Sequence, residues 1–110
     1  MSKKLYSVLA VVLLASFALA ACGGGAGGGD TFAACQVTDT GGIDDASFNA
    51  TAWKGIEDAV ADFGIEGKFL ESQQQTDYET NINAFIEEGC DLIITVGFLL
   101  GDATAAAAEA

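Results

Sequence analysis

Short apolar runs alternate with helix-like periodicity from residue 31 onward, and the alternation predicts three strands and three helices. Residues 32–38 form the first run, and residues 68–71 form a second, shorter one. Residues 92–96, with the sequence LIITV, form a third run of apolar and β-branched side chains. A continuous run of this kind is typical of a strand in a parallel sheet. We therefore expect this third strand to be buried on both faces.

The first helix is predicted between the first two runs. Its apolar residues recur at spacings of three and four, as on one face of a helix; they are Phe48, Ala52, Ile56, Ala59, Val60 and Phe63. Asp44, Asp45 or Ser47 can cap the start of this helix, and Gly64 follows its end.

The second helix is predicted to begin at a capping box over residues 76–79, with the sequence TDYE. Its apolar face consists of Tyr78, Ile82, Phe85 and Ile86. Gly89 is expected to end it, since glycine readily adopts the left-handed conformation found after helices. Residues 97–102 are expected to form a loop, and residues 103–110 to begin a third helix.

The order of these elements predicts an α/β fold with a parallel sheet. Right-handed crossovers favour the strand order 2-1-3, so we expect a Rossmann-like sheet with flanking helices. In this order the chain reverses its direction of winding between the first and third strands. Ligands bind outside the carboxyl ends of the strands at such a switch point. Residues 39–48 and 97–102 are therefore the predicted binding loops.

The chain begins with a pattern typical of a targeting segment. Two lysines precede an apolar stretch over residues 5–19, and the sequence LAAC follows at residues 19–22. This order indicates a bacterial lipoprotein signal peptide over residues 1–21, with a lipid on Cys22 after cleavage. A plain secretory signal peptide is the alternative. The location expected from this segment is the extracytoplasmic face of the cell membrane.

Residues 22–30 are glycine-rich and are expected to form a flexible tether between the lipid and the fold. A phosphate-binding loop is the alternative, but such a loop follows a strand and opens a helix. Residues 31–110 remain for the folded part, and about 80 residues is a marginal size for an independent core. The chain also stops inside ATAAAAEA without a helix stop signal. We expect residues 31–110 to be the N-terminal part of a longer domain.

Acidic residues dominate the charge, with sixteen Asp and Glu against four Lys and a formal net charge of −12. Such a surface repels nucleic acid, which we therefore do not expect as a partner. The chain has no histidine, the most common general base and metal ligand. Cys35 and Cys90 show neither CxxC nor zinc-type spacing. An oxidising location permits a disulfide, but the spacing does not require one, and we expect two buried apolar thiols.

Two segments carry a resemblance to a known family. VTDTGGIDDASFNATAWKGIEDA at residues 37–59 resembles the opening of the basic membrane protein family, also described as PnrA-like purine nucleoside receptors. CDLIITVGFLLGDAT at residues 90–104 is similar to the third strand and following loop of that family. The resemblance implies a lipid-anchored substrate-binding protein of an ABC importer, which pairs with an ABC permease. It also implies a two-lobed, periplasmic-binding-protein-like fold that holds a purine nucleoside between its lobes. This chain would supply part of the first lobe.

The candidate ligand-binding residues lie in the two predicted loops; they are Asp39, Gly42, Asp45, Phe48, Asn49, Gly97, Phe98 and Asp102. Asn49 offers a donor and an acceptor to a base or ribose. Asp39 and Asp45 can accept hydrogen bonds from the ligand, although a carboxylate here can equally serve the helix terminus. Gly42 lets the backbone approach a ligand closely.

The aromatic candidates each have an alternative role. Phe48 is either a stacking surface for a base or the first residue of the apolar helix face, and Phe98 either lines the cleft or belongs to the core. Asp102 either binds the ligand or caps the third helix. Trp53 is expected to pack at the surface of the lobe.

Other functions compatible with the pattern are receptors of the same architecture for a sugar or another small polar solute. An extracytoplasmic hydrolase that uses paired carboxylates such as Asp39 and Asp45 is a further alternative. The sequence offers no histidine, activated serine or metal cluster to support such catalysis. We therefore expect a binding protein rather than an enzyme, with no cofactor and no metal.

Overall fold

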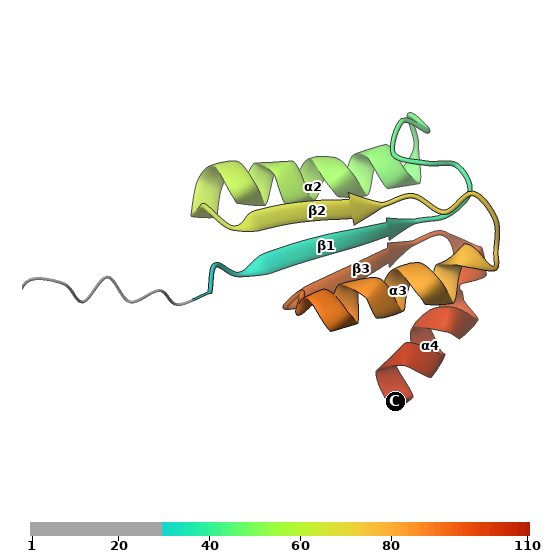
Figure 1. Cartoon of the computed structure of the whole chain (residues 1–110). Helices are drawn as coiled ribbons and strands as arrows, with labels where there is room; N and C mark the ends of the chain where they lie inside the picture. The colour runs from blue at the N-terminus through green and yellow to red at the C-terminus, as the bar shows by residue number, and fades with distance from the viewer. Residues whose placement is uncertain (1–29) are drawn as a thin grey trace, which may run out of the picture.

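The computed structural model describes residues 30–110, which form a three-stranded parallel sheet with helices on both faces (Figure 1). The strands are β1 (Ala33–Thr38), β2 (Glu66–Leu70) and β3 (Leu92–Val96), in the order β2-β1-β3. This order confirms the predicted 2-1-3 topology. The predicted signal peptide, the lipidation of Cys22 and nearly all of the predicted tether lie outside the described residues.

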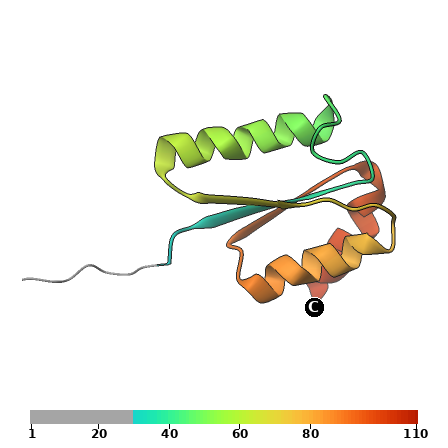
Figure 2. The ribbon, with the colours of Figure 1, turned by 45° about the horizontal axis from the view of Figure 1, so that its top comes forward.

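The helices divide between the two faces of the sheet. Helix α2 (Phe48–Phe63) covers one face, and α3 (Asp77–Glu88) and α4 (Gly101–Glu109) lie on the other (Figures 1 and 2). A short 3-10 helix, η1 (Phe98–Leu100), connects β3 to α4. The predicted loop at 97–102 is therefore mostly helical, and α4 begins two residues earlier than expected. Within residues 30–110 no helix combines the length and apolar character needed to cross a bilayer.

Strand β1 is the centre of the fold, and all six of its residues are buried. Alternate side chains of a strand point to opposite faces of the sheet. One set joins the main core on the side of α3, which contains Ala33, Cys35, Val37, Tyr78, Ile82, Phe85 and Leu100. The other set faces α2 and includes the buried polar side chain of Gln36.

The prediction that β3 is buried on both faces is wrong. Leu92 is 46% exposed, and the other four residues of β3 are half-buried. Among the described residues β3 pairs only with β1, whereas β1 has a strand on each side and takes the fully buried position. Strand β2 begins at Glu66, two residues before the predicted start. Gly67 lies so close to α2 that a Cβ there would be 2.8 Å from Ile56.

The predicted apolar face of α2 is only partly confirmed. Ile56 is buried, but Phe48 and Phe63 are each 79% exposed. Asn49 takes the second buried position of the helix, because its polar groups meet partners from β1 and from the loop that follows it. Trp53 packs at the lobe surface as expected, edge to face on Phe69 with ring centroids 4.9 Å apart.

The helix termini confirm the predicted C-caps and settle which residues cap the starts. Gly64 and Gly89 follow α2 and α3 in the left-handed conformation. The Asp45 carboxylate accepts the free backbone N–H groups at the start of α2. The predicted capping box of α3 is wrong, since Thr76 makes no side-chain cap bond. The Asp77 carboxylate instead accepts hydrogen bonds from the backbone of the preceding turn.

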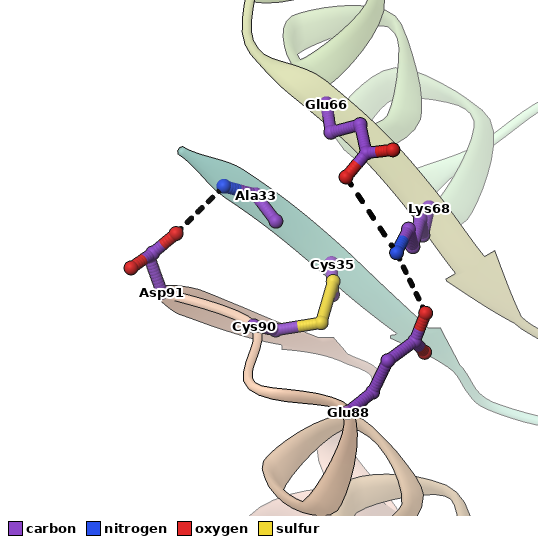
Figure 3. The surroundings of a disulfide bond; sticks show 7 residues. All are labelled: Ala33, Cys35, Glu66, Lys68, Glu88, Cys90 and Asp91. Atoms are coloured by element: carbon purple, nitrogen blue, oxygen red, sulfur yellow. Dashed lines mark hydrogen bonds and ion pairs between the residues drawn. A yellow bond between two sulfur atoms is a disulfide. The ribbon is translucent and has the colours of Figure 1, made fainter. Parts of the chain in front are cut away.

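Cys35 and Cys90 form a disulfide, which corrects the expectation of two buried thiols (Figure 3). The two residues are 55 positions apart in the sequence, and their Cα atoms are 6.2 Å apart. Parallel pairing explains this proximity: Cys35 is registered with Ile93 of β3, and Cys90 lies just before that strand. The spacing along the chain contains no information about this pairing, because it depends on strand order and register.

Candidate functional site

The carboxyl ends of β1 and β3 meet at one edge of the sheet, where the topology predicts a ligand. The backbone N–H of Asp39, the first residue after β1, donates to the carbonyl of Val96 at the end of β3, with a distance of 3.0 Å. The loop after β1 then runs to the start of α2, and η1 follows β3 (Figure 1). The two predicted binding loops are therefore adjacent.

Asn49 bridges two carboxylates at this edge. Its side-chain Nδ2 donates to Asp39 Oδ1 at 2.7 Å and to Asp45 Oδ2 at 3.1 Å. The backbone N–H of Asn49 also donates to Asp45 Oδ2, at 3.0 Å. We call Asp39, Asp45 and Asn49 the amide–carboxylate network. Three of the predicted site residues thus form one hydrogen-bonded unit.

The backbone of Asn49 is hydrogen-bonded to Gln36, a residue that the sequence analysis did not identify. Gln36 is fully buried on β1, and its Nε2 donates to the backbone carbonyl of Asn49 at 2.9 Å. The Asn49 side chain is itself only 1% exposed, and its Oδ1 is buried without a partner among the described residues. A glutamine inside an otherwise apolar strand is the sequence signal that could have pointed to this contact.

The Asp45 carboxylate accepts four hydrogen bonds from the start of α2. The backbone N–H of Ala50, followed by those of Ser47 and Asn49, donates to its carboxylate and lowers the pKa of Asp45 below its ordinary value, while desolvation partly opposes this shift. Hydrogen bonds that stabilise the charged form have this effect. Asp45 therefore stays ionised at neutral pH while it caps α2. Asp44, its neighbour, is exposed.

Two predicted glycines lie where a side chain would collide with a carboxylate. Gly97 has a φ of +126°, and a Cβ there would be 2.6 Å from Cβ and Oδ2 of Asp39. Gly42 has a φ of +70°, and a Cβ there would be 2.9 Å from Glu71 Oε1. Glu71, which follows β2, accepts the backbone N–H of Ile43 at 2.7 Å and so holds the loop after β1. Sequence reasoning did not identify Glu71.

The aromatic candidates both lie on the surface. Phe48 is 79% exposed at the start of α2, and Phe98 is 99% exposed at the start of η1. Neither belongs to the core, which excludes the alternative role given to each. Phe98 and Asp102 line a surface pocket together with Gln75, Leu99 and Gly101. Asp102 is exposed in the first turn of α4. Leu100 occupies the N-cap position of this helix, and no side chain makes a cap hydrogen bond there.

The arrangement combines hydrogen-bond acceptors with exposed aromatic surface. Asp39 is half-buried beside Gly97, and the exposed Phe48 precedes Asn49 in the chain. Such an edge can bind a polar molecule with a flat ring, because carboxylates accept from hydroxyl or amino groups and phenyl faces stack. Within residues 30–110 no group of three or more acidic or cysteine side chains is arranged to hold a metal ion.

The family model described as "ABC transporter substrate-binding protein PnrA-like" matches residues 32–110. The chain is 34% identical to the CD4+ T-cell-stimulating antigen of Listeria innocua, with 94% of this chain and 33% of that protein covered. It is 32% identical to the ABC transporter nucleoside-binding protein BmpA of Lactococcus lactis, with 99% and 34% covered. The chain thus spans about a third of the length of these relatives.

Solved structures show the same arrangement of elements. A solute-binding protein of an ABC transporter system from Aeropyrum pernix K1 superposes with a TM-score of 0.65 at 30% identity, covering 71% of this chain and 21% of that one. A fragment from Peptoclostridium difficile 630 superposes with a TM-score of 0.64 over 71% of this chain and 64% of that one. Its identity is 20%, so this second likeness concerns the fold alone.

Proposed function

Since this chain belongs to the PnrA-like family of ABC transporter substrate-binding proteins, we propose that it supplies part of the cleft of a receptor that delivers a purine nucleoside to an ABC importer. The amide–carboxylate network at the carboxyl edge of the sheet, together with the exposed ring of Phe48 at the start of α2, is the observation that carries this proposal. The description of the Lactococcus lactis relative as a nucleoside-binding protein supports the choice of ligand.

Asp39 is the proposed direct contact, and Asp45 supports it. Ribose hydroxyls and base amino groups are hydrogen-bond donors, which suits Asp39, since within residues 30–110 its Oδ2 accepts no hydrogen bond. The two oxygens of Asp45 already accept four hydrogen bonds. The amide hydrogens of Asn49 already bond to these two carboxylates, so we assign Asn49 the role of holding them in place. Gly97 keeps the space beside Asp39 free of a side chain, and Gly42 does the same beside Glu71, since a Cβ at either position would collide with that carboxylate side chain.

The two exposed phenylalanines are the proposed stacking surfaces. A base that stacks on a phenyl ring gains roughly 1–3 kcal/mol in nucleic-acid sites, which accounts for an aromatic side chain left in water without a ligand. Phe48 precedes Asn49 in the chain, and Phe98 shares its pocket with Asp102, which could accept a further hydrogen bond. The second lobe of the proposed two-lobed receptor would complete the cleft.

The proposed location is the extracytoplasmic face of the cell membrane, with a lipid on Cys22 and residues 22–30 as the tether. The LAAC sequence at residues 19–22 supports the anchor. The Cys35–Cys90 disulfide supports an extracytoplasmic location, because disulfides persist in oxidising compartments. An ABC permease is the proposed partner protein.

Calorimetry on the protein encoded by the longest open reading frame around these residues tests the proposal. Adenosine, guanosine, inosine, uridine and a set of sugars would be titrated, and each mixture would then be analysed for hydrolysis products. Micromolar or tighter binding of purine nucleosides without product is expected. Binding of sugars alone would show that the ligand is a solute other than a nucleoside. Release of base would indicate an enzyme.

A further inference from the structure

The disulfide lies at the amino edge of the sheet, opposite the candidate ligand site. The two cysteines differ in exposure (Figure 3): Cys35 is fully buried in β1, whereas Cys90 is half-buried. Cys90 also contributes to the lining of a pocket of about 510 Å³. A pocket of this size admits a small thiol. A thiol that enters this pocket therefore meets Cys90 rather than Cys35.

The pocket is strongly acidic. Its lining includes the four acidic residues Asp30, Glu66, Glu88 and Asp91, and a single basic residue, Lys68. The Lys68 ammonium is already paired, 2.6 Å from Glu88 Oε1 and 3.6 Å from Glu66 Oε2. The Asp91 carboxylate, next to Cys90 in the chain, accepts the backbone N–H of Ala33 at 2.8 Å. Figure 3 shows Glu66, Lys68, Glu88 and Asp91 around the two cysteines.

We propose that the Cys35–Cys90 disulfide is a thiol-exchange site, opened at Cys90 from the acidic pocket and selective for cationic or neutral small thiols over anionic ones. A thiolate attacks Cys90 Sγ, the S–S bond breaks, and Cys35 leaves as a thiolate that takes a proton. A second thiolate then attacks the sulfur of the first thiol in the mixed disulfide, which releases Cys90 and a small-molecule disulfide. Two thiols thus supply the two electrons that reduce the protein disulfide.

Electrostatics is the source of the selectivity. The attacking thiolate carries a negative charge, and the excess of carboxylates in the pocket repels it. An ammonium group on the same small molecule offsets this repulsion, and a sulfonate group increases it. Because the pocket is open to solvent, added salt screens both effects. The inference concerns the amino edge alone and does not depend on which ligand binds at the carboxyl edge.

The test measures how fast three thiols open the disulfide in the 110-residue chain, held in neutral detergent and carrying Cys22→Ser so that two cysteines remain. The thiols are cysteamine, 2-mercaptoethanol and mercaptoethanesulfonate, and each rate is divided by the rate of the same thiol on hydroxyethyl disulfide. The expected normalised rate for cysteamine exceeds that for mercaptoethanesulfonate by about tenfold at low salt. The ratio should fall towards one in 1 M salt.

Two further measurements locate the reaction. Mass spectrometry after acid quenching should find the first adduct on Cys90 with Cys35 as the free thiol. Glu88→Gln should reduce the cysteamine preference about two- to threefold, whereas Glu87→Gln, the same change at an exposed neighbour outside the pocket, should leave it unaltered. Equal normalised rates, an adduct on Cys35, or rates that do not depend on thiol concentration would each overturn the proposal, the last because opening would then require unfolding.

Discussion

The side-chain amide of Asn49 donates a hydrogen bond to the carboxylate of Asp39 across a distance of 2.7 Å, which ties the start of α2 to the end of β1. The same amide also reaches Asp45. Two carboxylates at the edge of a parallel sheet would repel each other without a donor between them. Asn49 therefore offsets the repulsion between the two carboxylates through a single amide group.

Asn49→Asp should disrupt this arrangement. The variant keeps the size of the side chain but replaces the donor with a third carboxyl group, so one of the three should have a raised pKa. In the protein used for calorimetry, the free energy of nucleoside binding at pH 7 should weaken by roughly 1–3 kcal/mol. Affinity should partly recover near pH 5, as that carboxyl group is protonated. Calorimetry at both pH values measures this.

Ser47→Ala is the matched control for Asn49→Asp. Ser47 is exposed at the N-cap position of the same helix and makes no side-chain cap bond. Its substitution should leave affinity unchanged at both pH values. If Asn49→Asp also bound normally while its melting curve was unaltered, the network would not be part of the ligand site.

Phe48→Ala and Phe98→Ala should weaken nucleoside binding by roughly 1–3 kcal/mol each, because each removes a stacking surface. Both side chains are largely exposed, at 79% and 99%, so the free energy of unfolding should change little. Phe63→Ala is the control, since Phe63 is equally exposed at 79% but lies at the far end of α2. A loss of affinity in Phe63→Ala as large as in the other two would point to a general surface effect.

Asp45→Asn should lower the melting temperature at pH 7 by several degrees. Hydrogen bonds from Ala50, Ser47 and Asn49 lower the pKa of Asp45 from its ordinary value of 3.8. A carboxyl group with a lowered folded-state pKa adds stability above its unfolded-state pKa and loses it as pH falls through the folded-state value. The difference between wild type and variant should therefore be constant from pH 7 to about pH 5 and shrink below 3.8.

The control for this pH dependence is Asp44→Asn, the same change at the exposed neighbour. Its melting temperature should follow that of the wild type across the pH range. Circular dichroism melts from pH 2.5 to 7 measure both variants, and an Asp45→Asn deficit that persisted unchanged at pH 2.5 would contradict the assignment of Asp45 as an ionised cap.

Gly97→Ala should destabilise the fold by about 1–3 kcal/mol from backbone strain alone, since a φ of +126° is accessible almost only to glycine. The collision with Asp39 adds to this cost. Gly101→Ala, four residues later, should be neutral or slightly stabilising, because Gly101 has a helical φ of −54° and open space around it. Urea denaturation of both variants gives the comparison; equal stabilities would contradict the close packing of Gly97 on Asp39.

Replacing both disulfide cysteines should also cost stability. The bond joins residues 55 positions apart, and closing a loop of that length corresponds to about 4 kcal/mol of unfolded-state entropy. Cys35→Ala with Cys90→Ala should therefore unfold at a clearly lower urea concentration than the oxidised chain. Oxidised chain treated with a neutral thiol should match the double variant, and a reduced chain as stable as the oxidised one would refute this estimate.

Much of the candidate site could be predicted because it follows from topology. Asp39 comes directly after β1 and Gly97 directly after β3, so parallel pairing brings them to one edge. The role of Asn49 could not be predicted in the same way. A helical pattern defines a face only to within about one residue of rotation, and here Asn49 replaces Phe48 on the packed side of α2.

By itself, the sequence determined the order of the elements, the 2-1-3 arrangement of the strands and the two loops that meet at the carboxyl edge. These follow from hydrophobic periodicity, which is local, and from the handedness of crossovers, which is general. Only the tertiary structure decided that Cys35 bonds to Cys90, that Gln36 supports Asn49, and that Phe48 remains in solvent. Those relationships depend on strand register and helix rotation, which arise from the contacts of segments that are distant in the chain.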